Sequence, residues 1–168
     1  MKLDRLTRLF LFTIAAMVLQ WLDSDIALPG AVSSGLGLYL TVVTFAVFVC
    51  SVGEGAVLTL LWAVLRAVIL DGFADFLIFG AGGLLAFFTV AGLKAVLKEN
   101  QVWIAVCMAT LAYGLGHLLT LMWVDHSLAW LLLAPMTMVY SVFSGLFMGL
   151  ATQFVIRKGK NLWTTIFK

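Results

Sequence analysis

Six apolar segments, each about long enough to cross a bilayer, follow one another along the chain, and no connection exceeds about a dozen residues. A helix needs about 20 mainly apolar residues to span the hydrocarbon core. The predicted spans are residues 6–22, 35–51, 54–70, 75–97, 101–124 and 128–156. The second and third are short enough to form a helical hairpin or to include a re-entrant piece. No stretch remains for a separate soluble domain, so residues 1–168 are predicted to form a single membrane domain.

Composition agrees with an all-α, polytopic integral membrane protein. Hydrophobic residues make up 64% of the chain, charged residues 11%, and the mean hydropathy is +1.14. Soluble domains are about half apolar and about a quarter charged. The chain also lacks the alternating segments of about ten residues that are typical of membrane barrels. The fold is therefore predicted to be a bundle of about six transmembrane helices.

The basic residues predict the orientation of the spans. With the N-terminus inside, cytoplasmic parts hold nine of the ten basic residues, namely Lys2, Arg5, Arg8, Lys94, Lys98, Arg157, Lys158, Lys160 and Lys168. Cytoplasmic loops are enriched in Lys and Arg. Both termini are therefore predicted in the cytoplasm of a bacterium, with the chain as a multi-pass protein of the cytoplasmic (inner) membrane. Five acids fall on the outer side, namely Asp23, Asp25, Asp71, Asp75 and Asp125.

The first apolar segment also has features of a secretory signal, because Lys2, Arg5 and Arg8 precede it. However, "WLDSDIALPGA" offers no clear cleavage site with small residues, and five further spans follow. We therefore interpret residues 6–22 as the first span.

Arg66, the tenth basic residue, lies inside the third span, about one helical turn below its outer end. A charge at this depth is costly and points either to function or to a nearby polar group. The guanidinium could reach the headgroups, Asp71 or Asp75. Alternatively, it could face the bundle and bind an anionic or strongly polar part of a ligand, because its donor geometry suits carboxylate and phosphate.

His117 and Tyr113 lie in the outward half of the fifth span. His117 is either a packing residue or a contact to a ligand in the same half as Arg66. Tyr113 is a candidate for stacking on that ligand. Trp123 and Trp130 are explained by the aromatic belt at a membrane interface.

Small residues form a stripe on the sixth span, where Ser141, Gly145 and Gly149 recur every four positions. This spacing places them on one helix face and allows a partner helix to pack closely. Glu54 is interpreted as a favourable acid at a helix start, with a cytoplasmic or membrane partner as the alternative. Cys50 and Cys107 have no metal-ligand spacing and are predicted to be free thiols.

Motifs of enzymes are absent from the sequence. No paired carboxylates, metal-ligand cluster or nucleophile with a base can be recognised. The glycine run "FGAGGLLA" is not followed by the Lys-Ser/Thr of a phosphate loop. The dispersed basic residues do not suit nucleic acid. We therefore predict no catalytic residues, no metal and no cofactor.

The order of several motifs resembles that of a known family. These are "LPG", "LGLYL", "GEGAVLTLLWAVLRAVILDG", "GAGGLLAFF" and "APMTMVYSVFSGLFMGL", which cover about residues 15–151. The chain resembles the Gx transporter family, also named heptaprenyl diphosphate synthase component I. That family is similar in size and layout to the substrate-binding S-components of energy-coupling-factor (ECF) transporters. Leu40 departs from the family pattern, which usually has an Asn there.

The resemblance implies a substrate-binding component that takes up a small vitamin-like molecule or an isoprenoid or quinone precursor. From their positions in the outward half, the candidate ligand contacts of such a component are Arg66, His117, Tyr113, Asp71 and Asp75. A membrane coupling subunit and ABC-type ATPases would be the partners. S-components commonly carry Ala-x-x-x-Ala on the first span for helix contacts, and here only Ala15 and Ala16 offer such a surface.

Two alternatives come from other functional classes. One is a membrane subunit that partners a polyprenyl diphosphate synthase, and the other is a membrane scaffold similar to the rod-shape protein of cell-wall machineries. The first requires a soluble enzyme at the cytoplasmic face. The second would depend on helix faces such as Ser141, Gly145 and Gly149, and would tolerate changes in the outward half.

Overall fold

The computed structural model describes residues 4–25, 38–69 and 73–167. In chain order the elements are α1 (Arg5–Asp25), α2 (Tyr39–Phe45), the π-helical turn η1 (Ala46–Cys50), α3 (Val52–Ile69), α4 (Phe73–Lys94), the 3-10 turn η2 (Glu99–Gln101), α5 (Val102–Val124), the 3-10 segment η3 (Leu128–Leu133), α6 (Ala134–Lys158) and α7 (Lys160–Phe167). No strand occurs in these ranges, which confirms the predicted all-α fold.

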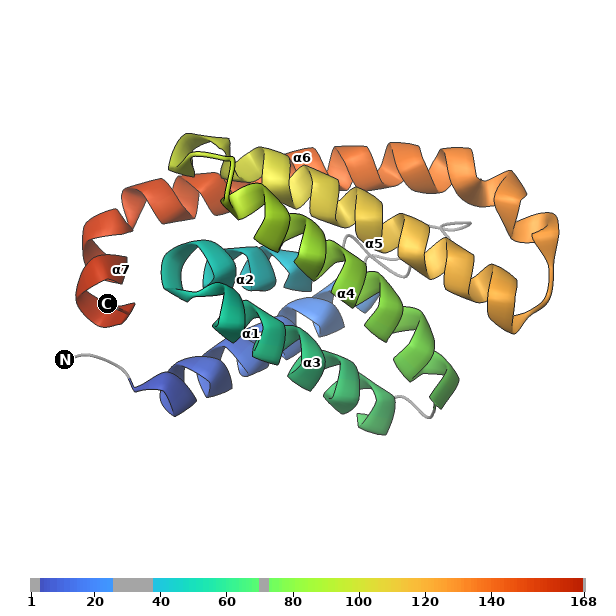
Figure 1. Cartoon of the computed structure of the whole chain (residues 1–168), viewed down its shortest axis with the longest axis horizontal. Helices are drawn as coiled ribbons and strands as arrows, with labels where there is room; N and C mark the ends of the chain where they lie inside the picture. The colour runs from blue at the N-terminus through green and yellow to red at the C-terminus, as the bar shows by residue number, and fades with distance from the viewer. Residues whose placement is uncertain (1–3, 26–37, 70–72, 168) are drawn as a thin grey trace.

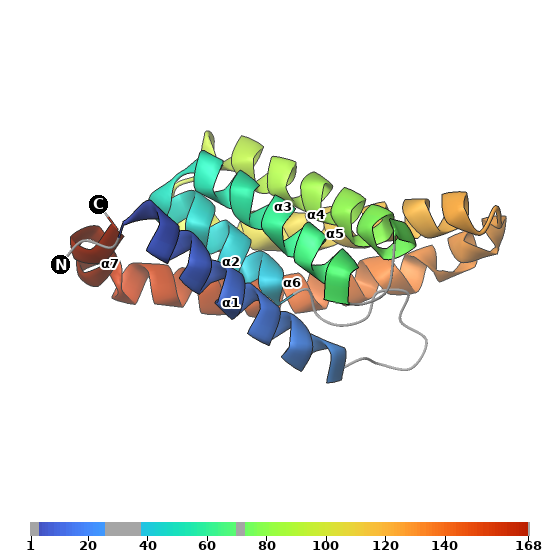
Figure 2. The same ribbon diagram turned by 90° about the horizontal axis from the view of Figure 1, so that it is seen from below.

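The helices form an elongated bundle in which α5 lies between α4 and α6 (Figure 1). The short helix α2 sits inside the bundle and contacts α1, α3, α4, α5 and α6. Helix α1 lies at the edge, beside α2 and α3 (Figure 2). The start of α1 and the final helix α7 lie at the same end of the bundle in both views. We call this the basic end, because seven basic residues belong to it: Arg5, Arg8, Lys94, Lys98, Arg157, Lys158 and Lys160.

Side-chain caps fix where several helices begin. The Asp4 carboxylate accepts a 2.7 Å hydrogen bond from the Thr7 amide at the start of α1. The Ser51 hydroxyl accepts a 3.1 Å hydrogen bond from the Glu54 amide at the start of α3. Each satisfies an amide that a helix leaves without an internal partner. Helix α5 ends before His126, whose φ of 49° is left-handed and incompatible with a further α-helical turn.

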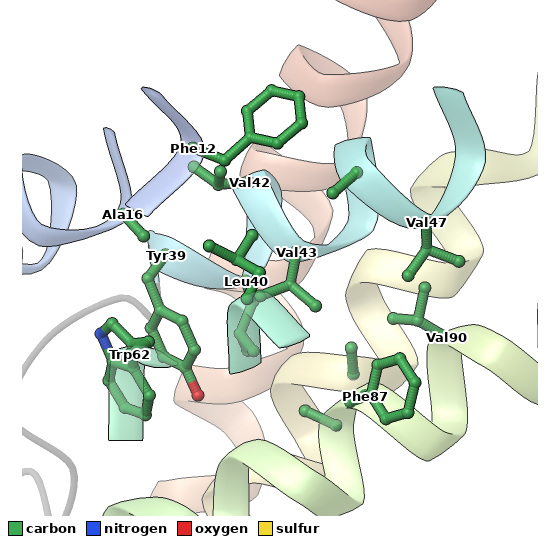
Figure 3. Packing of buried hydrophobic residues seen from close by; sticks show 14 of the residues in the cluster. Phe12, Ala16, Tyr39, Leu40, Val42, Val43, Val47, Trp62, Phe87 and Val90 are labelled. Atoms are coloured by element: carbon green, nitrogen blue, oxygen red, sulfur yellow. The ribbon is translucent and has the colours of Figure 1, made fainter. Parts of the chain in front are cut away.

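The largest buried cluster joins α1, α2, α3, α4 and α5. Its fully enclosed side chains include Trp62, Tyr39, Leu40 and Leu58. Figure 3 shows the Trp62 indole beside the Tyr39 ring, with the aliphatic side chains of α2 packed toward Phe87 and Val90. At the basic end, the Phe45 ring contacts both Phe12 of α1, at 5.9 Å between centroids, and Trp163 of α7, at 5.2 Å.

Helix α6 shows that polar and apolar side chains are distributed opposite to the usual soluble pattern. Its buried face carries Thr137, Ser141, Ser144, Gly145, Gly149, Thr152 and Ile156. Its outer face carries large apolar side chains, and Phe143 and Phe147 are 70% and 71% exposed. Large contiguous apolar surfaces are rare on soluble monomers. Small residues inside and large apolar residues outside are expected when lipid is the solvent.

Within the described ranges, two helical segments are long and apolar enough to cross a membrane, Val102–Val124 and Leu128–Lys158. Shorter apolar helices cover Tyr39–Cys50, Val52–Leu65 and Gly80–Lys94. The fold thus provides two such segments, and the full set of six crossings stays a prediction.

Candidate functional site

Aromatic rings from three helices meet in the middle of the bundle. Tyr39 of α2 stacks on Trp62 of α3, with centroids 3.8 Å apart and an interplanar angle of 6°. Tyr113 of α5 meets Tyr39 edge to face, with centroids 5.5 Å apart at 74°. Each such pair stabilises by about 0.5–1.5 kcal/mol beyond the burial of area. These rings and His117 are referred to below as the aromatic cluster.

Glycines on α4 make room for the aromatic cluster. A Cβ atom added to Gly82 would lie 3.0 Å from a Tyr113 ring carbon and 3.1 Å from the Tyr113 carbonyl oxygen. A Cβ atom added to Gly83 would lie 3.4 Å from both the Trp62 ring and the Tyr39 hydroxyl oxygen. The "GAGG" run of the sequence therefore serves close packing of α4 against the rings.

His117 lies one turn beyond Tyr113 on α5 and belongs to the same face. The two ring centroids are 6.2 Å apart, and His117 is 5% exposed. A histidine enclosed in this way can hydrogen-bond through either ring nitrogen. Together with the phenols of Tyr39 and Tyr113 and the indole N–H of Trp62, it brings polar atoms into the middle of the bundle.

Arg66 lies four residues after Trp62 on α3, so its backbone is one turn from the aromatic cluster toward the end opposite the basic end. Its side chain is outside the described part of the structure, as are Asp71 and the side chain of Asp75. The predicted contacts between Arg66 and Asp71, Asp75 or a ligand therefore stay predictions. The structure does bring His117 and Tyr113 together on α5.

A second polar group lies at the basic end and was not predicted. The Arg8 guanidinium of α1 and the Glu54 carboxylate of α3 form an ion pair at 2.5 Å. Glu54 is 4% exposed, and its second carboxylate oxygen is buried as well. Nearby, the Lys94 ammonium donates a hydrogen bond to the Val47 carbonyl in η1. The sequence did contain a signal for this pair. Glu54 is the one acid where the second and third apolar segments meet, on the side of the predicted membrane that carries the basic residues.

The predicted stripe on α6 packs inside the chain. Ser141, Gly145 and Gly149 face α5, where the Thr110 hydroxyl donates a 2.9 Å hydrogen bond to the Ser141 carbonyl. A Cβ atom added to Gly149 would lie 2.6 Å from the Trp103 carbonyl oxygen. The neighbouring helix is thus α5 of the same chain, which occupies the surface expected to receive a partner helix.

The two alanines of α1 have different surroundings. Ala16 is fully buried in the core, whereas Ala15 lines an apolar groove of about 330 Å³. The groove is bounded by α1, α2 and α6. Ala15 is therefore the one of the pair that an external helix could reach.

Cys50 and Cys107 are both free thiols, as predicted. Among the described residues, no three His, Cys, Asp or Glu side chains are placed to hold a metal ion.

Comparisons with known proteins give no assignment. No protein-family model, no curated protein and no solved structure matches the chain. The features of the chain that bear on its function are therefore the aromatic cluster, the charges and the apolar exterior.

Proposed function

We propose that the chain is the substrate-binding membrane component of an ECF-type uptake transporter. The observation that carries this proposal is the aromatic cluster. Tyr39, Trp62, Tyr113 and His117 are gathered from three helices, one turn below the position of Arg66. Binding sites for small molecules are mostly apolar and aromatic, with a few polar groups that fix orientation. The cluster and Arg66 together have this composition.

The membrane part of the proposal is supported by three features. Two segments have the length and hydropathy of membrane spans, and α6 exposes large apolar side chains while burying small polar ones. Basic residues of α1, α4, the α4–α5 connection, α6 and α7 belong to one end of the bundle. In our proposal α1, α2 with η1, α3, α4, α5 and η3 with α6 are six crossings, and the basic end faces the cytoplasm.

The ligand class follows from the same groups. Flat rings suit a vitamin-like ring system or an unsaturated chain such as an isoprenoid or quinone precursor, and Arg66 suits an anionic substituent. In this proposal the chain itself supplies recognition. A membrane coupling subunit and ABC-type ATPases supply the energy for uptake.

The experiment compares Arg66→Ala with Arg5→Ala, which removes an exposed arginine at the opposite end of the bundle. Each chain is purified in detergent from its native membrane, and co-purified proteins and small molecules are identified by mass spectrometry. We expect the wild-type chain and Arg5→Ala to retain a small molecule together with a coupling subunit and ATPases. Arg66→Ala should retain at least about tenfold less, because a hydrogen bond to a charged group contributes about 1.5–3 kcal/mol.

Normal retention by Arg66→Ala would show that the guanidinium reaches the headgroups instead. Recovery of a prenyl synthase or of cell-wall proteins, with no small molecule, would contradict the transporter proposal. Equal thermal stability of both variants is required, so that a folding defect is not taken for a binding defect.

A further inference from the structure

The junction of α6 and α7 concentrates positive charge at the protein surface. Arg157 and Lys158 end α6, and Lys160 begins α7, so three basic side chains fall within four residues. All three are exposed. Basic residues in the last turn stabilise a helix through its dipole, but this purpose does not require three cations.

Two of these cations border a hollow in the outer face of α6. Its volume is about 480 Å³, and it is lined by Leu150, Gln153, Phe154, Arg157 and Lys158. Leu150 and Phe154 form the apolar part of the lining, and Arg157 and Lys158 form its cationic part, nearer the basic end. None of the lining residues that the structure describes is acidic. The Lys158 ammonium lies 5.9 Å from the centroid of the Phe154 ring, where the cationic and apolar parts meet.

We propose that this hollow binds an anionic phospholipid of the membrane leaflet at the basic end. Arg157 and Lys158 hold the phosphate, because guanidinium and ammonium groups both bind phosphate oxygens. Phe154 and Leu150 contact the first part of an acyl chain. A soluble phosphate compound would satisfy the cations but would leave the apolar half of the hollow unfilled, so the mixed lining favours a lipid.

Helix α7 supports this assignment independently. Its sequence "KNLWTTIF" places Leu162, Trp163 and Ile166 on one side and polar residues on the other. Trp163 packs against Phe45, and Leu162 stays exposed, so the apolar side of this amphipathic helix both covers the bundle and offers a contact to the membrane–water interface. The Trp163 indole donates a 3.1 Å hydrogen bond to the Val155 carbonyl, which ties α7 to the last turns of α6. Arg157 and Lys158 therefore lie at the depth of the phosphate groups when α7 lies in the interface.

The test measures lipid binding to the purified full-length chain by native mass spectrometry. Phosphatidylglycerol is titrated against the wild type, against Arg157→Gln/Lys158→Gln and against the control Arg5→Gln/Lys98→Gln. The control removes two exposed charges from the same end but away from the hollow. We expect about a 30-fold loss of affinity in the first double variant, because each basic residue near a membrane surface contributes about 1 kcal/mol and tenfold corresponds to about 1.4 kcal/mol. The control should change by less than about threefold.

Three results would overturn the proposal. Equal losses in both double variants would mean that general surface charge attracts the lipid. Equal affinity of the wild type for phosphatidylglycerol and phosphatidylcholine would remove the role of the negative headgroup. Displacement of the lipid by millimolar pyrophosphate, with pyrophosphate binding lost in Arg157→Gln/Lys158→Gln, would reassign the hollow to a soluble phosphate compound. The test needs only that α6 cross the membrane, so its outcome is separate from that of the ligand experiment on Arg66.

Discussion

Helices α5 and α6 are joined in a different way from helices α1 and α3. The α5–α6 contact runs along the stripe Ser141, Gly145 and Gly149, where the absence of large side chains lets two backbones approach. The α1–α3 pair has one strong polar contact, the Arg8–Glu54 ion pair at the basic end. The apolar groove lined by Ala15 also lies beside α1, between this helix, α2 and α6.

The difference shows two ways of holding helices together, and both suit the proposed membrane, in which apolar side chains gain little by leaving lipid for protein. Close backbone contact gains dispersion energy at every turn and is damaged by added volume. A buried ion pair is local and is damaged by the removal of one charge. The labelling rates of the two free thiols can follow the two contacts separately. Cys107 lies against α6 at the α5–α6 contact, and Cys50 lies near Glu54 of the ion pair.

The largest effect is expected from Gly145→Ala. The added Cβ atom would overlap the Thr110 hydroxyl and lie 2.7 Å from the Cα atom of Cys107. We expect a loss of about 3 kcal/mol in the free energy of unfolding, the upper part of the range for overpacking. Unfolding in mixed detergent micelles measures the loss, and maleimide labelling of Cys107 should accelerate while labelling of Cys50 should not.

Gly92→Ala is the matched control for this prediction. Gly92 is exposed on α4, and an added Cβ atom has no neighbour within 4 Å. This change should stabilise by about 0.5–1 kcal/mol, because alanine loses less backbone entropy than glycine. If both variants were equally stable, α5 and α6 could not be in backbone contact.

A comparable loss, from a different cause, is expected for Arg8→Met. This change leaves the Glu54 carboxylate buried without its cation, which costs about 3 kcal/mol. Labelling of Cys50 should now accelerate, and labelling of Cys107 should stay unchanged. The control Arg5→Met alters an exposed arginine one turn earlier on α1 and should stay within about 0.5 kcal/mol. Faster labelling of both thiols in Arg8→Met would mean that the two regions unfold together.

The smallest effect concerns the first turn of α1 and depends on pH. Hydrogen bonds from Thr7 lower the pKa of Asp4 below its ordinary value of 3.8. Because the folded pKa is the lower one, this cap contributes fully above pH 3.8 and is lost as the pH falls through the folded value. Asp4→Ala should therefore be less stable than the wild type at about pH 6, and this difference should shrink as the pH falls below 3.8. A difference that persists at low pH would show that the carboxylate charge is not what caps the helix.

The positions of the helices were largely predictable from the sequence. The predicted span 101–124 corresponds to α5 at Val102–Val124, and 75–97 corresponds to α4 at Phe73–Lys94. An apolar run of bilayer length is a local signal that needs no knowledge of neighbours. Helix α7 was missed because it is short and half polar, and the π-helical turn η1 was missed because no local pattern in "AVFVC" distinguishes it from an α-helix.

The contacts of the candidate site were less predictable. Tyr113 and His117 share a face because they are four residues apart on one helix, and the sequence alone shows this. The Tyr39–Trp62 stack depends on how α2 crosses α3, and the Arg8–Glu54 pair joins residues 46 positions apart. Such pairings are set by packing across the whole bundle. The roles of Arg66, Asp71 and Asp75 stay predictions, to be decided by the ligand experiment.

The start of α1 and the helix α7 lie at one end of the bundle, where the Phe45 ring contacts both Phe12 and Trp163. In the proposed membrane orientation, with the long axis of the bundle across the bilayer, a chain that returns to the end where it started passes through the bilayer an even number of times. The proposed orientation therefore predicts that reporter proteins fused before α1 and after α7 sit in the same compartment. A linker could also join the start of α1 to the end of α7 in a circularly permuted chain whose new ends open at the connection between α5 and η3.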